Sequence, residues 1–109
     1  MKSILNIICI LMLHQILFGG TTGKLSGTLK DKETGEPLIG CNIIIENTYL
    51  GTSSNEKGEY VLLNIPPKSY SIRFEMIGYK KLVNEGVTII SDKTTSLNGA
   101  LVSSVIAGE

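Results

Sequence analysis

The chain has 109 residues, with ten Lys and Arg, ten Asp and Glu and one histidine, so its formal net charge is zero. This length favours a single domain. Nucleic acid is not an expected partner. Its binding depends on an excess of Lys and Arg that neutralises phosphates, and this chain has no such excess.

The first element, residues 1–22, is predicted to be a secretory signal peptide. Lys2 supplies a positive start, residues 4–18 form an apolar run, and the small residues Gly-Gly-Thr-Thr-Gly follow it. The apolar run is shorter than the roughly 18 residues that suggest a membrane-spanning helix, so a retained anchor is the lesser alternative. Cleavage is expected between Gly19 and Gly23. We therefore expect export through the Sec pathway, to the periplasm or outer membrane or as a secreted protein.

Removal of this segment changes the chemistry available to the chain. It takes away Cys9 and the only histidine, His14, and leaves one cysteine, Cys41. Without histidine, zinc peptidase sites and histidine-assisted serine or cysteine hydrolysis lack their usual residues. A single thiol forms no internal disulfide. We predict a non-enzymatic protein with no catalytic residues, no metal site and no cofactor.

The rest of the chain alternates apolar and polar residues, a pattern typical of strands, and no window shows a helical period. Turn signals separate the apolar segments. These features indicate an antiparallel sandwich or barrel of six or seven short strands. The expected strands cover residues 24–30, 41–47, 51–54, 60–65, 70–79, 82–90 and 94–102.

The stretch NEKGEYVLLNIPPKSY contains a turn, a strand and a second turn. The Asn55 side chain can fold onto nearby backbone as an Asx-turn, and Gly58 supplies a positive φ without steric cost. Tyr60 then points inward. Pro66 and Pro67 end the strand, because proline cannot donate to a ladder. This stretch is predicted to fold the chain back rather than to bind or catalyse.

Two groups of residues could suggest chemistry, but each has a simpler interpretation. Asp31, Glu33 and Glu36 loosely resemble a calcium loop, yet they lack its ligand spacing and are expected to be solvated. Cys41 shares the parity of the apolar residues that follow it and has no cationic neighbour. We therefore predict a buried structural thiol rather than a reactive one.

Three apolar residues, Ile44, Val61 and Leu63, lie on the strand faces opposite the clear inward sets. A loop could cover them, or they could form an exposed patch that docks a partner. We expect this patch to be at least partly open. The edge strands of a sandwich also offer unpaired N–H and C=O groups to another strand.

The sequence TGEPLIGCNIIIENTYLGTSSNEKGEYVLLNIPPKSYSIRFEMIGYKK resembles the carboxypeptidase regulatory-like domain. The resemblance implies an all-β, seven-stranded antiparallel Greek-key sandwich of the transthyretin (prealbumin)-like type, over residues 23–102. Cys41 replaces the usual Ala and Lys68 the usual Gly, which leaves the geometry of the second hairpin open. The matching motifs are the Gly-x-Pro-Leu-x-Gly turn at 35–41, the Ile-rich strand at 43–45, the Gly-rich step at 51, the Asn/Gly turn at 55–60, Ile-Pro at 65–70 and Gly-Tyr at 78–79.

Domains of this family accompany zinc carboxypeptidases or lie at the N-terminus of outer-membrane receptors, including TonB-dependent transporters. The predicted export signal directly before the domain resembles the receptor arrangement. The resemblance then implies a non-catalytic accessory module that contacts the receptor's plug, its barrel or an associated lipoprotein, and that is membrane-associated only through the receptor. Residues 103–109 are expected to be a tail or the start of a linker to a missing downstream region.

Two alternatives remain open. The chain could be a free-standing secreted module for adhesion, or for binding carbohydrate or protein. More weakly, it could be an ancillary domain of an exported zinc carboxypeptidase. Fold-level analogy supports all of these functions and does not choose between them.

Overall fold

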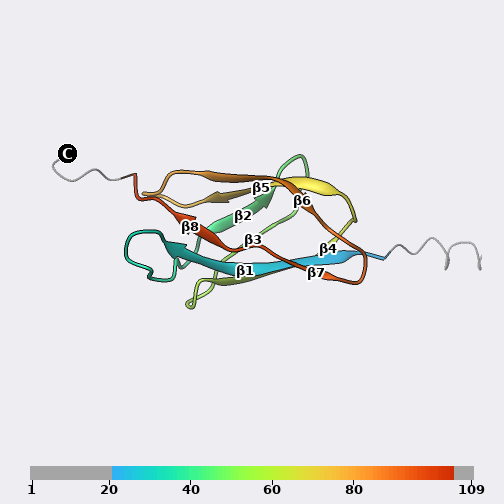
Figure 1. The fold of residues 1–109 in the computed structure, drawn as a ribbon, viewed down its shortest axis with the longest axis horizontal. Helices are drawn as coiled ribbons and strands as arrows, with labels where there is room; N and C mark the ends of the chain where they lie inside the picture. The colour runs from blue at the N-terminus through green and yellow to red at the C-terminus, as the bar shows by residue number, and fades with distance from the viewer. Residues whose placement is uncertain (1–20, 105–109) are drawn as a thin grey trace, which may run out of the picture.

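A computed structural model describes residues 21–104, which fold into eight strands (Figure 1). Within this range, no helix is long and apolar enough to cross a membrane. The strands are β1 (Gly23–Asp31), β2 (Asn42–Ile45), β3 (Gly51–Ser53), β4 (Glu59–Ile65), β5 (Ser69–Glu75), β6 (Leu82–Thr88), β7 (Thr94–Ser96) and β8 (Gly99–Leu101).

The strands form two four-stranded sheets that face each other as a sandwich. One sheet has the order β4-β1-β7, with β8 also paired to β1, and the other has the order β3-β2-β5-β6. Figure 1 shows these two layers running along the same long axis. The all-β sandwich is confirmed, and two separate sheets replace the barrel that the strand pattern alone had left open.

The last two strands pair with β1 in a parallel direction, unlike the antiparallel arrangement expected. Lys24 aligns with Thr94 and Asp31 with Leu101, so β7 and β8 share one register along β1. They are therefore two halves of one edge strand, interrupted at residues 97–98. Counted together they give the predicted seven strands. Parallel pairing is possible here because a long connection through the other sheet separates β1 from β7.

The interruption between β7 and β8 has its own hydrogen bonds. The Asn98 side-chain oxygen accepts the Thr28 N–H at 2.9 Å, and the Leu97 N–H donates to the Ser26 oxygen at 2.8 Å. The Leu97 carbonyl oxygen lies directly over Gly27, where a Cβ would collide with it. Glycine at this inward position of β1 is thus a steric requirement rather than a weakness of the strand.

The core lies between the sheets. Tyr60 of one sheet meets Phe74 of the other edge-on, with ring centroids 6.0 Å apart. Burial of each such large side chain stabilises the fold by about 1.5–3 kcal/mol. The alternation in the sequence therefore identified the inward faces correctly. The buried apolar residues are Leu25, Leu29, Leu38, Cys41, Ile43, Ile45, Tyr60, Leu62, Ile65, Tyr70, Ile72, Phe74, Ile89 and Leu101.

The turn before β4 has the predicted structure. The N–H groups of Lys57 and Glu59 both donate to Asn55 Oδ1 at 2.9 Å. Gly58 has a φ of 75°, and its carbonyl oxygen accepts the Leu29 N–H at 2.8 Å. The asparagine side chain therefore shapes the turn, and the glycine joins it to β1. The interpretation of this stretch as a folding element is confirmed.

The predicted second hairpin is instead a crossover, because β4 and β5 belong to different sheets. This connection accommodates Lys68 without backbone strain. Among the described residues, the non-glycines with positive φ are Asn47, Asn64 and Asp92, and Lys68 is not one of them. Asn64 has a φ of 60°, in the left-handed region that asparagine tolerates better than most residues. The replacement of the family's usual glycine at position 68 is therefore compatible with this fold.

The ends of the described chain bear on the predicted boundaries. Residues 1–20 of the predicted signal peptide and residues 105–109 of the predicted tail lie outside the described residues. The first two tail residues are attached to the sandwich, because Ser103 bridges Tyr79 and the Ser104 N–H donates to the Gly78 oxygen at 2.9 Å.

Candidate docking surfaces

The structure separates the three residues predicted to form one docking patch. Val61 and Leu63 lie on the outer face of β4 and are 56% and 50% exposed. Ile44 is half-buried on β2, which belongs to the other sheet. The outer faces of a sandwich point in opposite directions, so the prediction of a single patch is wrong for Ile44. Strand parity shows which face of its own strand a residue occupies, but not which sheet that strand joins.

The surface around Ile44 carries a network of charges. Arg73 lies opposite Ile44 on β5. Its Nη1 is 3.1 Å from Glu46 Oε1 and its Nε is 3.2 Å from Glu75 Oε1, while Lys81 Nζ lies 3.5 Å from the same Glu75 oxygen. The aliphatic part of an arginine side chain can cover a neighbouring apolar residue while its guanidinium stays hydrated. This face therefore presents mainly charge.

The surface around Val61 and Leu63 has no such cover. In the register of the sheet, Val61 pairs with Ser26 of β1, and Ser26 pairs with Ser96 of β7. These small hydroxyl side chains are too short to shield their apolar neighbours. A shallow depression of about 340 Å³ lies on this face. It is lined by Ser26, Gly27, Thr28, Glu59, Tyr60, Val61, Ser96 and Asn98.

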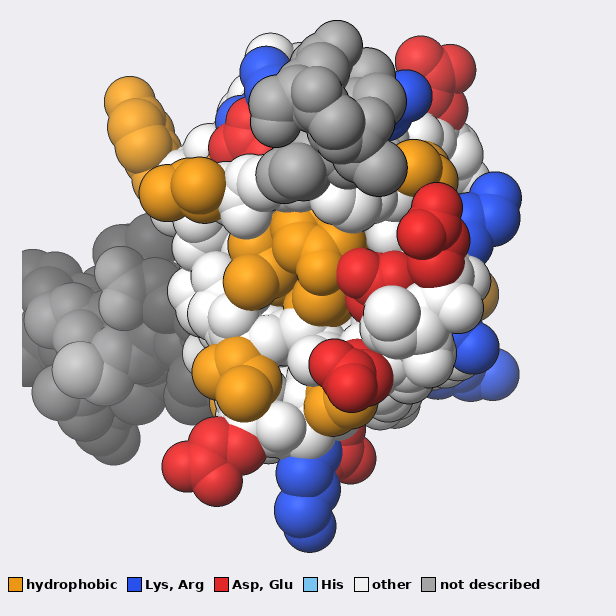
Figure 2. All heavy atoms as spheres, turned by 90° about the vertical axis from the view of Figure 1, so that its left-hand side faces the viewer, with side chains coloured by type: hydrophobic (Ala, Val, Ile, Leu, Met, Phe, Trp, Pro, Cys, Tyr) orange, Lys and Arg blue, Asp and Glu red, His pale blue; other side chains and the backbone are white. Residues whose placement is uncertain are grey.

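A second exposed apolar surface lies at one end of the sandwich. Figure 2 shows hydrophobic side chains gathered at the centre of this end, with acidic side chains beside them. Ile77, in the turn between β5 and β6, is fully exposed. The sequence pattern missed this surface because it placed residues 70–79 in one continuous strand, whereas β5 ends at Glu75.

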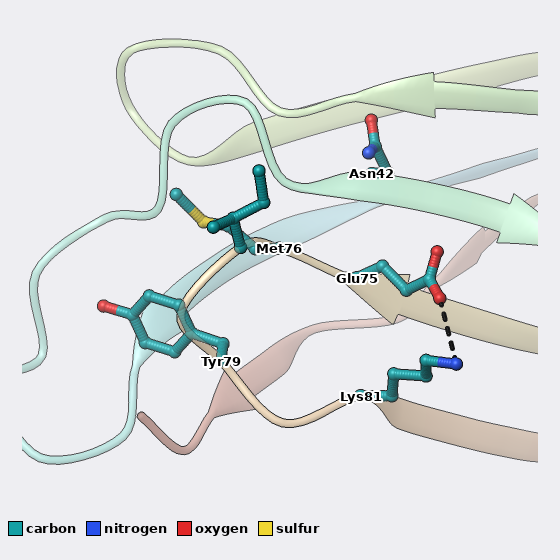
Figure 3. Close-up of a pocket in the computed structure, with 6 residues that line it drawn as sticks. Asn42, Glu75, Met76, Tyr79 and Lys81 are labelled. Atoms are coloured by element: carbon teal, nitrogen blue, oxygen red, sulfur yellow. Dashed lines mark ion pairs between the residues drawn. The ribbon is translucent and has the colours of Figure 1, made fainter. Parts of the chain in front are cut away.

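A depression of about 270 Å³ adjoins this turn (Figure 3). Figure 3 shows Met76 and Tyr79 on the loop, with the ion pair of Glu75, at the end of β5, and Lys81, just before β6. The depression thus has an apolar side and a charged side. Its lining residues are Asn42, Glu75, Met76, Ile77, Tyr79 and Lys81.

Asp31 at the same end joins the two sheets. Its Oδ2 accepts the Tyr79 hydroxyl at 2.7 Å, and its Oδ1 accepts the N–H groups of Glu33 at 2.8 Å and Thr34 at 3.1 Å. The Tyr79 hydrogen bond is the main reason why the pKa of Asp31 is lowered, and the same bond raises the pKa of Tyr79. In residues 21–104, no group of three or more His, Cys, Asp or Glu side chains could hold a metal ion.

Cys41 is fully buried, as predicted. Its Sγ lies 3.5 Å from the carbonyl oxygen of Glu75, and its N–H donates to Ser54 Oγ at 3.0 Å. Burial raises the pKa of the thiol to about 11, so the thiol is protonated at neutral pH. A protonated, inaccessible thiol is a poor nucleophile. The structural interpretation of Cys41 is confirmed.

The hydroxyl groups of two tyrosines also bond to the backbone of the sandwich. Tyr60 OH donates to the Leu97 oxygen and Tyr70 OH donates to the Pro66 oxygen, both at 2.6 Å. Burial raises the pKa of Tyr60. Both rings pack inward, so neither is available as a platform for a ligand.

These features define a small two-sheet β-sandwich with exposed apolar side chains on the outer face of β4 and in the turn after β5, among other sites. Residues 25–108 match the sequence model of the CarboxypepD_reg-like domain, and the chain belongs to this family. The resemblance to the carboxypeptidase regulatory-like domain is thereby confirmed. No curated protein matches the chain.

Solved structures share the fold at low sequence identity. A cohesin–X-dockerin complex of Acetivibrio cellulolyticus matches with a TM-score of 0.63 and 16% identity, over 83% of this chain and 64% of that one. A Bacteroides uniformis protein, provisionally described as carbohydrate-binding, matches with a TM-score of 0.60 and 16% identity, over 77% and 43%. The minor pilin GBS52 of Streptococcus agalactiae matches with a TM-score of 0.58 and 15% identity, over 82% and 48%. The chain thus spans less than two-thirds of each of these proteins.

Proposed function

We propose that this chain is a non-catalytic, exported accessory module, the N-terminal domain of a TonB-dependent outer-membrane receptor. The receptor would take up a nutrient such as a glycan, a peptide or a metal chelate. The main support is the family match across almost the whole sandwich, together with the signal-like segment predicted just before it. The module assists docking or assembly, and transport itself belongs to the receptor.

The use of polar side chains in the sandwich supports a non-catalytic role. Asn55 shapes a turn, Asp31 binds a loop and Tyr79, and Ser54 Oγ donates to the Leu38 carbonyl oxygen at 2.5 Å. Catalysis requires polar groups that converge on a substrate. These groups instead bond to backbone or, for Asp31 and Tyr79, to each other.

The exposed apolar side chains support a role in docking. Exposed apolar side chains lie on the β4 face (Val61 and Leu63) and at the end of the sandwich (Ile77). A partner surface that covered them would remove the free-energy cost of their exposure to water. The expected partner is a protein of the cell envelope, such as the receptor's plug, its barrel or an associated lipoprotein.

Envelope fractionation tests the proposal. An antibody raised against residues 21–104 should detect the module in the outer-membrane fraction, as part of a polypeptide much longer than 109 residues. A product of this size in the culture medium would contradict the receptor assignment and support the free-standing module. A zinc-ligand set encoded in the same reading frame would support the carboxypeptidase alternative.

The free-standing binding module is the second candidate. Its support is the shared fold with a cohesin–dockerin complex and with a provisional carbohydrate-binding protein, whose names indicate protein and sugar partners. Calorimetric titration of residues 21–109 with soluble glycans tests the carbohydrate form. Saturable binding would favour this candidate over the receptor module.

A further inference from the structure

Three of the four sheet edges carry features that discourage pairing with another strand. β3 has three residues, the β7/β8 strand is interrupted, and β6 contains Gly86 with a φ of 68° beside a register shift. Short, broken or bulged edges are the usual protection against edge-to-edge association. The remaining edge, β4, is seven residues long and keeps a regular register with β1 over Glu59–Leu62; its own register shift, with Asn64 at a φ of 60°, lies near its end.

The exposed edge of β4 has free backbone groups beside its exposed side chains. The Gly58 oxygen accepts the Leu29 N–H of β1, and alternate residues of an antiparallel strand bond to the same neighbour. Tyr60 and Leu62 therefore face β1, and Val61 directs its N–H and C=O groups away from it. Leu63 has the parity of Val61 and precedes the irregularity at Asn64. Glu59 faces the same way, but Asn55 already binds both its N–H and its C=O.

We propose that β4 pairs antiparallel with β4 of a second copy of this chain, about a two-fold axis at Leu62. This register places Val61 of each copy opposite Leu63 of the other, so the free backbone groups bond to each other and the apolar side chains form one stripe. Like charges do not face each other across the strands. The exposed turn that carries Glu56 in one copy approaches the exposed turn that carries Lys68 in the other. The paired surface is small, so the dimer is weak.

Sedimentation equilibrium of residues 21–109 tests the pairing, over roughly 10 µM to 1 mM, because such small interfaces dissociate in this range. The wild-type average mass is expected to rise with concentration. Val61→Pro removes an N–H that faces the free edge, so the fold should tolerate it while dimerisation weakens by about tenfold or more. Leu63→Lys should also weaken the dimer, because it places a charge in the apolar stripe. If the Val61→Pro variant unfolds, this second variant tests the pairing. Val83→Lys, at a 43% exposed site on β6, is the matched control and should dimerise like wild type.

Cysteine crosslinking tests the register itself. Cys41 is buried, so only introduced thiols should react in the folded protein. A mixture of the Val61→Cys and Leu63→Cys variants should form disulfide-linked dimers faster than either variant alone. A wild type that stays monomeric at every concentration overturns the proposal. So does a folded Val61→Pro protein that dimerises normally, or crosslinking that is no faster in the mixture.

Discussion

The two outer faces of this sandwich differ although their strands have similar sequences. Asn-Ile-Ile-Ile in β2 and Tyr-Val-Leu-Leu in β4 are both apolar on both sides. On the β2 face, Arg73 and its two glutamates lie beside Ile44. On the β4 face, serines lie across the sheet from Val61, which stays exposed. The two outward apolar sites thus differ in the length and charge of their cross-strand neighbours.

The largest effect on stability is expected in the core between the two sheets. Cys41→Asp places an unpaired charge between the sheets and should lower the free energy of unfolding by about 3 kcal/mol or more. Cys41→Ala removes only a small volume and should cost about 1 kcal/mol. Urea unfolding followed by circular dichroism measures both values. Equal losses for the two variants would mean that the site tolerates charge and is not closed.

A smaller effect is expected at Ile44, on the charged face. Ile44→Glu removes a half-buried apolar side chain and adds a third carboxylate near Glu46 and Glu75, so we expect a loss of about 1–2 kcal/mol. Raising the salt concentration should reduce the part of this loss that comes from charge repulsion. A melting temperature of Ile44→Glu equal to that of wild type would show that neither the half-burial of Ile44 nor the neighbouring carboxylates affect stability at this site.

The hydrogen bond between Asp31 and Tyr79 ties the two sheets at one end. Its contribution to the stability of the fold should be modest and pH-dependent. The lowered pKa of Asp31 adds stability that is complete above the ordinary value near 4 and is lost as the pH falls through the folded value. The raised pKa of Tyr79 adds stability below the ordinary value near 10, which is lost as the pH rises through the folded value.

Tyr79→Phe removes this hydrogen bond without a large change in shape. Its melting temperature should lie below that of wild type at neutral pH, and the gap should narrow in strong acid and strong base. A gap that stays constant across the whole pH range would show that the bond contributes nothing through ionisation.

The smallest effect on stability is expected on the β4 face. Val61→Glu and Leu63→Glu exchange exposed side chains for other exposed side chains, so each should change the free energy of unfolding by less than about 0.5 kcal/mol. Their effect should appear in association with a partner instead, measured by pull-down from envelope extract. A fall in melting temperature as large as that of Ile44→Glu would remove the contrast between the two faces.

Local chemistry in the sequence determined much of this fold. Period-2 alternation identified the inward sides of β2, β4 and β5, because the pleat of a strand turns successive side chains to opposite faces. Asn55 and Gly58 predicted their turn, because an Asx hydrogen bond and a positive φ depend on neighbouring residues alone. The burial of Cys41 followed from the same parity.

Only the tertiary structure decided which sheet each strand joins, and hence that Ile44 lies apart from Val61 and Leu63. It also decided the parallel pairing of β7 and β8 with β1, and the open edge of β4. These features depend on hydrogen bonds between segments far apart in the chain, such as Lys24 and Thr94. A strand's own residues present the same donors and acceptors to any neighbour, so its local sequence does not specify its partner.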